Sequence, residues 1–110
     1  MNTISRDDLR ALISSGVSFV LAEALDAPYF EKGHLTGAIN MPLGRVAEIA
    51  KRAIGSASSP VVVYCASATC ENSHIVARKL DALGYTDVRV HAGGKADWEA
   101  AGLPLERSAA

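Results

Sequence analysis

The chain has 110 residues, which is enough for one hydrophobic core and predicts a single domain. Its 49% hydrophobic and 21% charged residues are typical of a globular protein, and its net charge of −1 argues against nucleic acid or an anionic membrane as a partner. The N-terminus lacks the apolar run of a secretory signal, and no run approaches membrane-spanning length. We therefore expect a cytoplasmic protein whose two cysteines are reduced.

The first third of the chain predicts two helices with a strand between them. Ser5 can cap a helix that begins at Arg6, and Gly16 is a natural stop for it. The compact apolar run over residues 17–21 predicts a strand. Asp26 can then cap a short helix.

The rest of the chain alternates between strand and helix patterns. The expected elements are a strand over 38–41, a helix over 43–54, a strand over 61–64, a helix over 73–83, a strand over 88–91, a last short helix around 97–99 and a frayed tail over 106–110. Val76, Leu80 and Leu83 are expected on one apolar face of their helix. Strands that alternate with helices in this way predict an α/β fold with a parallel sheet.

The stretch from Pro60 to Ser73 predicts a reactive thiol. Its apolar run, which ends at Tyr64, is typical of a strand covered on both faces, and Cys65 follows at the carboxyl end, where parallel sheets bind ligands. Backbone N–H groups of the small-residue loop and of the next helix would lower the pKa of Cys65 and hold a small oxyanion. This anion-binding loop comprises Ala66, Ser67, Ala68, Thr69, Cys70, Glu71, Asn72 and Ser73. From these residues alone, a Cys65 that is merely a buried apolar residue is an equal alternative.

Four segments, in this order, resemble the single-domain rhodaneses, a superfamily of sulfurtransferases. They are residues 33–42 (GHLTGAINMP), 61–65 (VVVYC), 83–88 (LGYTDV) and 92–104 (AGGKADWEAAGLP). The resemblance implies a rhodanese-like α/β fold, with a central parallel five-stranded sheet and helices on both faces. It implies one rhodanese-like domain over residues 1–110, with a core from about 5 to 105, no cofactor, and a persulfide on Cys65.

The chain departs from the family pattern in two places. The segment from Glu23 to Leu25 stands where rhodaneses commonly have Asp-Val-Arg. Cys70 stands where the family's loop has an arginine, and Ser73, matched to the hydroxyl residue at the helix start, comes about two positions late. The resulting Cys-x4-Cys loop resembles that of a branch of bacterial rhodanese-like proteins. Because arginine is the usual clamp on an oxyanion and Glu71 adds negative charge, the departure argues against thiosulfate more than against cysteine chemistry.

The function implied by the resemblance is transfer of sulfane sulfur through Cys65. The donor would be a small molecule such as thiosulfate or a persulfide, and the acceptor a thiol or a cyanide-like nucleophile, including a protein thiol. One alternative is a phosphate or arsenate enzyme of the same fold, and another is a non-catalytic interaction module or persulfide carrier.

Cys70 has several interpretations from its place in the loop. It could attack a persulfide on Cys65 as a resolving thiol, receive a sulfur, act as a redox switch or be a passive replacement for the arginine. A zinc site is a weaker interpretation, because the Cys-x4-Cys spacing is wide and no second cysteine pair exists, so no metal is predicted. The residues that such a site would need are Cys65, Cys70, His74 and His91.

Four residues outside the loop have structural interpretations. We expect His34 to hold its Gly-His turn and Trp98 to pack the last helix on the sheet. Lys95 and Arg45 could replace the missing arginine, but a solvated surface charge is the favoured interpretation of each.

Overall fold

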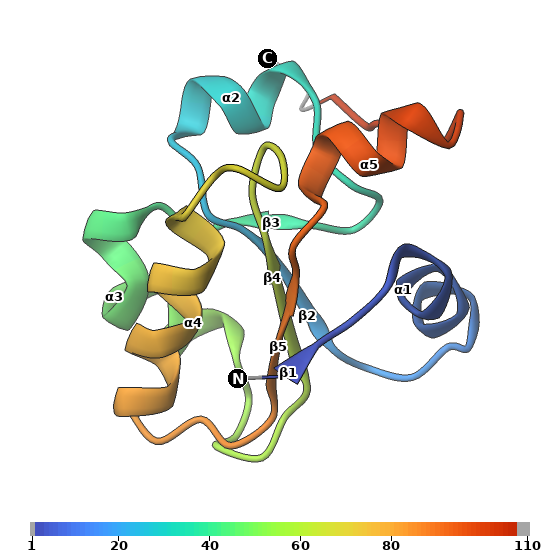
Figure 1. Ribbon diagram of the computed structural model, residues 1–110. Coiled ribbons are helices and arrows are strands. Elements are labelled where there is room, and N and C mark those ends of the chain that lie inside the picture. The colour runs from blue at the N-terminus through green and yellow to red at the C-terminus, as the bar shows by residue number, and fades with distance from the viewer. Residues whose placement is uncertain (1, 108–110) are drawn as a thin grey trace.

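A computed structural model describes residues 2–107 of the chain and shows one parallel sheet of five strands. The strands lie in the order β1 (Asn2–Thr3), β5 (Val88–His91), β4 (Val61–Tyr64), β2 (Val20–Glu23) and β3 (Ile39–Asn40). Every neighbouring pair is parallel, so the carboxyl ends of the strands meet at one edge of the sheet (Figure 1). The predicted fold class is confirmed.

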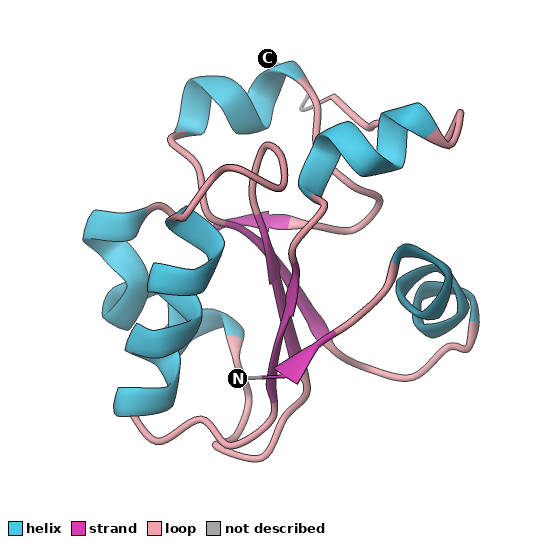
Figure 2. Cartoon of the chain, in the orientation of Figure 1, coloured by secondary structure: helices cyan, strands magenta, loops and turns pink. Residues whose placement is uncertain are grey.

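Helices cover both faces of this sheet (Figure 2). They are α1 (Arg6–Ser14), α2 (Ala27–Lys32), α3 (Val46–Ala53), α4 (Asn72–Ala82) and α5 (Gly94–Ala100). In Figure 1, α3 and α4 lie on one face, α1 and α5 lie on the other, and α2 lies above the carboxyl ends of the strands. The longest helix of residues 2–107 has 11 residues, and none is long and apolar enough to cross a bilayer.

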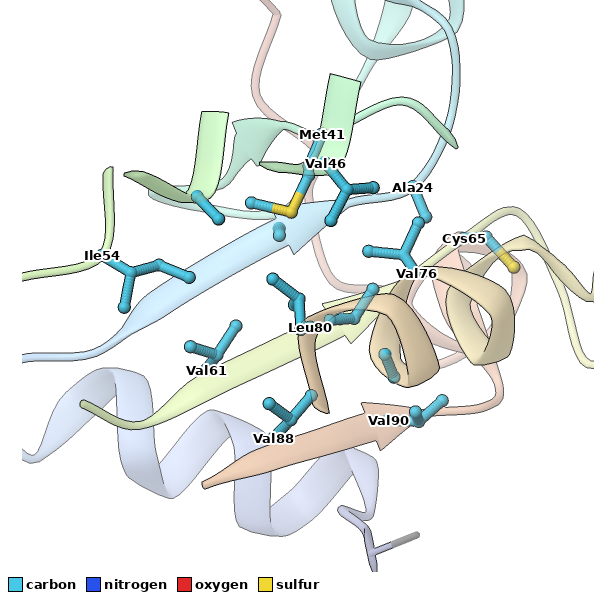
Figure 3. Close-up of a cluster of buried hydrophobic side chains, with 14 residues drawn as sticks. Ala24, Met41, Val46, Ile54, Val61, Cys65, Val76, Leu80, Val88 and Val90 are labelled. Atoms are coloured by element: carbon cyan, nitrogen blue, oxygen red, sulfur yellow. The ribbon is translucent and has the colours of Figure 1, made fainter. Parts of the chain in front are cut away.

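The central strand divides the core into two hydrophobic clusters, because successive side chains of a strand point to opposite faces. Val61, Val63 and Cys65 belong to the cluster under α3 and α4, which Figure 3 shows. Val62 and Tyr64 belong to the cluster that contains Leu9 of α1 and Trp98 of α5. Cys65 and Tyr64 therefore face opposite sides of the sheet, although they are neighbours in the chain.

The strands over 61–64 and 88–91 have the bounds that the sequence predicts, whereas the first internal strand does not. That strand was expected over residues 17–21 and lies instead at Val20–Glu23. Pairing with β4 explains the shift, because Val20 lies opposite Val61 and Glu23 lies opposite Tyr64. Val17, which comes before the paired segment, is exposed.

Several helix boundaries and caps also differ from the expected ones. The helix expected over 43–54 begins with a single 3-10 turn, η1 (Leu43–Arg45), in which the N–H of Arg45 donates to Pro42. Asp26 makes no side-chain capping bond to α2. Leu83 follows the end of α4 and is exposed, so its expected place on the apolar face is wrong.

The expected frayed tail is wrong for Glu106. Its backbone exchanges two hydrogen bonds of 2.8 Å with His34, and its carboxylate accepts one from the N–H of Gly37. These bonds tie the tail to the loop between α2 and β3. Residues 108–110 of the expected tail lie outside the described residues.

The cap of α1 gives a first testable prediction. Ser5 has extended backbone angles, and its hydroxyl oxygen accepts a hydrogen bond of 3.1 Å from the N–H of Asp8. We expect Ser5→Ala to lower the free energy of unfolding by about 1 kcal/mol, because that N–H loses its partner. Urea denaturation measures the difference, and Ser18→Ala, in an exposed loop, is the control. An equal effect of the two changes would contradict the cap.

Candidate active site

Cys65 follows β4 directly and lies beneath the loop that connects β4 to α4. Its side chain is 1% exposed. Its Sγ lies 3.2 Å from the carbonyl oxygen of Cys70 and 3.5 Å from the hydroxyl of Ser73. Figure 3 shows the sulfur directed away from the aliphatic cluster and towards this loop. The cysteine thus belongs to the core by its carbon atoms and to the loop by its sulfur.

The loop turns back so that its second cysteine lies over the first. The N–H of Cys70 donates to the carbonyl of Ser67 at 3.1 Å, which closes a turn, and the hydroxyls of Ser67 and Thr69 are 3.1 Å apart. The backbone carbonyl of Cys70 lies 3.2 Å from the Cys65 sulfur, so the two cysteines are neighbours. Both are free thiols, Cys65 buried and Cys70 partly exposed.

The two thiols differ in their tendency to ionise. Burial raises the pKa of Cys65, and its contact with Cys70 raises it further, against the opposing hydrogen bonds from Ser73. Partial burial also opposes ionisation of Cys70, but hydrogen bonds from the Cys65 thiol and from the N–H groups of Ala66 and Asn72 lower its pKa overall. The expected lowering of the Cys65 pKa is therefore wrong. The loop's N–H donors favour charge on Cys70, and the pair loses its first proton as a unit.

The structure brings only part of the predicted anion-binding loop to the sulfurs. Ser73 contacts Cys65 through its hydroxyl, while Ala66 and Asn72 donate backbone N–H groups to Cys70. The side chain of Asn72 instead donates to the carbonyl of Ala24 at 3.1 Å, which fixes the start of α4 to the end of β2. The remaining loop residues with exposed side chains are Ala68, Thr69 and Glu71.

The N-terminus of α5 holds the first residues of the loop. The N–H of Lys95 donates to the carbonyl of Cys65 at 3.0 Å, and the N–H of Ala96 donates to the carbonyl of Ala66 at 2.9 Å. Gly94 makes this approach possible with a φ of +63°, since a Cβ there would lie 2.3 Å from the Cys65 oxygen. The glycine pair of residues 93–94 signals a permissive turn in the sequence, but not which backbone it would approach.

A buried ion pair lies at the same edge of the sheet. Oε1 of Glu23 accepts hydrogen bonds from the ammonium group of Lys95 at 3.0 Å and from the hydroxyl of Tyr64 at 2.9 Å. The same ammonium donates to the carbonyl of Tyr29 at 2.9 Å. Burial raises the pKa of Glu23, while Lys95 and Tyr64 oppose the rise. The Lys95 side chain is only 13% exposed, so its expected role as a solvated charge is wrong.

Neither cation suggested by the sequence replaces the loop's arginine. Lys95 is bound to Glu23, which also accepts a hydrogen bond from Tyr64, and alternation along β4 puts Tyr64 on the opposite face of the sheet from Cys65. Arg45 pairs with Glu48 at 2.8 Å on the surface, as its predicted interpretation requires. Both charges are thus already paired.

The expected structural roles of His34 and Trp98 are confirmed. The His34 ring stacks on Phe30 with centroids 4.0 Å apart, and its Nδ1 lies 2.9 Å from the Phe30 carbonyl. Trp98 is buried, and its indole N–H donates to the carbonyl of Pro104 at 3.2 Å.

The four residues that a zinc site would need, Cys65, Cys70, His74 and His91, do not form one cluster. Nδ1 of His91 lies 3.1 Å from the carbonyl oxygen of Ile4, and its side chain points to the face opposite Val88 and Val90, which belong to the same cluster as Cys65. Among residues 2–107, no three His, Cys, Asp or Glu side chains come together to hold a metal ion.

Several solved structures are similar to this chain in fold. The BH2092 protein from Bacillus halodurans, 22% identical, shares the fold with a TM-score of 0.88 over 96% of this chain and 77% of its own. The thiosulfate sulfurtransferase from Pseudomonas aeruginosa is 28% identical, with a TM-score of 0.86 over 98% of this chain and 20% of its own. A Rhodopseudomonas palustris protein of unknown function, described as a possible tyrosine phosphatase, is 26% identical, with a TM-score of 0.82 over 96% of this chain and 85% of its own.

Comparison of the sequence with known families and with curated proteins gives two results. None of the curated proteins matches it significantly. The family model for the rhodanese-like domain matches residues 5–101. This range includes the whole loop between β4 and α4 and every strand except β1. The chain therefore belongs to the rhodanese-like domain family.

Proposed function

We propose that this chain is a sulfurtransferase that carries sulfane sulfur as a persulfide on Cys65. The observation that carries the proposal is the position of Cys65 at the carboxyl end of the central strand, with Cys70 and Ser73 around its sulfur. The donor is a small sulfane compound such as thiosulfate or a persulfide. The acceptor is a thiol, free or on a protein, or cyanide.

The chemistry needs a sulfur nucleophile and groups that hold negative charge. A thiolate attacks the outer sulfur of the donor, the new S–S bond forms, and the donor's remainder leaves with the electron pair of the broken bond. An acceptor then attacks the outer sulfur of the persulfide and restores the thiolate. The N–H and hydroxyl of Ser73, at the start of α4, favour negative charge on Cys65 sulfur.

A second candidate function is hydrolysis or reduction of a tetrahedral oxyanion such as phosphate or arsenate. The similarity to the Rhodopseudomonas palustris protein described as a possible tyrosine phosphatase favours it. The loop argues against it, since residues 66–71 contain no cation and Glu71 is acidic. The third alternative, an interaction module without catalysis, gives no role to a free thiol pair at this position.

Intact-protein mass spectrometry tests the proposed function. After incubation with thiosulfate, or with an organic persulfide, we expect the wild type to gain one sulfur atom, located on Cys65 by fragmentation. Cyanide should remove that sulfur and release thiocyanate. The double variant Cys65→Ser/Cys70→Ser, which lacks both thiols, is the control and should gain none.

Parallel assays separate the alternatives. Release of phosphate from an aryl phosphate, or reduction of arsenate, without any gain of sulfur would favour the oxyanion enzyme. If no donor adds sulfur and neither oxyanion reacts, the sulfurtransferase proposal is wrong and the interaction module takes its place.

A further inference from the structure

We propose that Cys70 attacks the external sulfur donor first, and that the sulfur then moves from Cys70 to Cys65 within the loop. This relay rests on the proposed sulfurtransferase function and adds the route by which sulfur reaches a buried thiol. It gives the loop's second cysteine a step of its own in the reaction.

Access is the first argument for the relay. A donor must bring its outer sulfur into contact with the attacking thiolate, and the side chain of Cys65 is only 1% exposed. The carbonyl of Cys70 lies 3.2 Å from its Sγ, on the side towards the loop, and the Ser73 hydroxyl lies 3.5 Å away. Cys70 itself is partly exposed. Of the two cysteines, Cys70 is therefore the one with surface in contact with solvent.

Charge is the second argument. The thiolate is the nucleophilic form of cysteine. Hydrogen bonds from the Cys65 thiol and from the N–H groups of Ala66 and Asn72 lower the pKa of Cys70, whereas burial raises the pKa of Cys65. Burial therefore disfavours charge on Cys65, while the loop favours it on Cys70, the less buried residue of the pair.

Both steps balance without an oxidant or a reductant. With thiosulfate as donor, the Cys70 thiolate bonds to the outer sulfur, the S–S bond to the sulfite group breaks, and sulfite leaves with the electron pair. The Cys65 sulfur then bonds to the transferred sulfur. The bond between the transferred sulfur and the Cys70 sulfur breaks, and the Cys65 proton passes to Cys70. The more acidic thiol leaves faster and the more basic thiol retains the sulfur, so the relay runs towards Cys65.

The competing reaction of the same pair has a different balance. If one cysteine attacked the inner sulfur of a persulfide on the other, hydrosulfide would leave and a Cys65–Cys70 disulfide would form. Each turnover would then consume two electrons from an external reductant, such as a dithiol. The relay requires none, which is why transfer of the outer sulfur is the reaction we propose.

Single-turnover loading of the wild type and three variants tests the order of the thiols. Each protein is mixed with thiosulfate, quenched at short times and weighed by mass spectrometry. We expect Cys65→Ser still to gain one sulfur, located on Cys70, because the attacking thiol is intact. Cys70→Ser should load Cys65 about tenfold more slowly or worse, because the accessible thiolate is gone. Cys70→Ala, which adds no hydroxyl, is the matched control and should be as slow.

A second measurement uses the unmodified protein and does not depend on the folding of any variant. Brief exposure of the wild type to iodoacetamide, without a sulfur donor, should alkylate Cys70 about tenfold faster than Cys65. Peptide fragmentation distinguishes the two sites. Faster alkylation of Cys65 would contradict the access and charge arguments together.

The outcomes separate the relay from the function on which it rests. If the wild type gains no sulfur from any donor, the proposed function fails. If the wild type and Cys70→Ser load equally fast while Cys65→Ser gains none, sulfur transfer stands and the relay is wrong. A mass loss of two hydrogens with release of sulfide would replace the relay with the disulfide reaction.

Discussion

Replacing Lys95 with methionine is expected to lower the free energy of unfolding by about 3–5 kcal/mol at pH 7. The change removes the cation that lies 3.0 Å from the Glu23 carboxylate, whose side chain is fully buried. Within residues 2–107, Oε2 of Glu23 already has no hydrogen-bond partner, and Oε1 would keep only the Tyr64 hydroxyl. An uncompensated buried carboxylate is therefore the source of the loss, and urea denaturation measures it.

The pH dependence of this variant identifies Glu23 as the cause. Burial raises the pKa of Glu23 in the folded protein, and removal of Lys95 takes away the strongest opposing contribution. The folded variant then binds a proton more tightly than the unfolded chain does, so its stability falls as pH rises between the unfolded and the folded pKa. We expect the deficit of Lys95→Met relative to the wild type to shrink as pH is lowered from 7 towards the unfolded pKa of glutamate.

Two further variants serve as controls for Lys95→Met. Glu23→Gln combined with Lys95→Met should recover part of the lost stability, because the amide replaces a buried charge with a neutral group. Arg45→Met breaks the surface pair with Glu48, whose partners are both exposed, and should leave stability unchanged. Equal losses in Lys95→Met and Arg45→Met would show that the buried pair has no special role.

Gly94→Ala is the second large effect that we expect, with a loss of about 2–5 kcal/mol in the free energy of unfolding. The residue has a φ of +63°, which alanine adopts only with strain, and its Cβ would lie 2.3 Å from the carbonyl oxygen of Cys65. Because that oxygen and the Ala66 oxygen accept the N–H groups of Lys95 and Ala96, the loop must move as well. We therefore expect slower sulfur loading together with the lower stability.

Gly102→Ala separates backbone strain from the close contact at Gly94. Gly102 has a φ of +76°, but a Cβ there would meet nothing within 4 Å. Its replacement should cost only the strain, about 1–2 kcal/mol, and should leave sulfur loading unchanged. If both alanine variants lost the same stability and neither changed loading, the contact between Gly94 and Cys65 would carry no weight. Urea denaturation and loading of each variant with thiosulfate give the two readouts.

The internal strands β4 and β5 could be predicted to the residue, whereas the bounds of β2 and the edge strand β1 could not, for a physical reason. The run from Val61 to Tyr64 is apolar on both faces, so any register buries it, and its limits follow from the sequence alone. The bounds of β2 depend on its pairing with β4, which the isolated run over residues 17–21 does not contain. β1 has only two residues, both exposed, and gives no hydrophobic pattern at all.

In the candidate site, too, local sequence patterns predict some features, whereas others depend on contacts between elements. The place of Cys65 at a strand end and of Ser73 at a helix start follows from local patterns, and both lie where expected. The ionisation of the thiol pair could not be predicted, because it depends on Cys70 folding back over Cys65. The burial of Lys95 likewise depends on the docking of α5 against the end of β4.

At the carboxyl edge of the sheet, the buried ion pair and the thiol pair lie on opposite faces. The buried Glu23–Lys95 pair lies on the α1 and α5 side, while the thiol pair lies under α4, and among residues 66–71 only Cys70 packs against a hydrophobic cluster. Residues 67–71 therefore contribute little to the two hydrophobic clusters, and the stability of the sheet depends mainly on residues outside them. We therefore expect that a loop of another length, with an arginine in place of Cys70, can replace this segment with little repacking of the core.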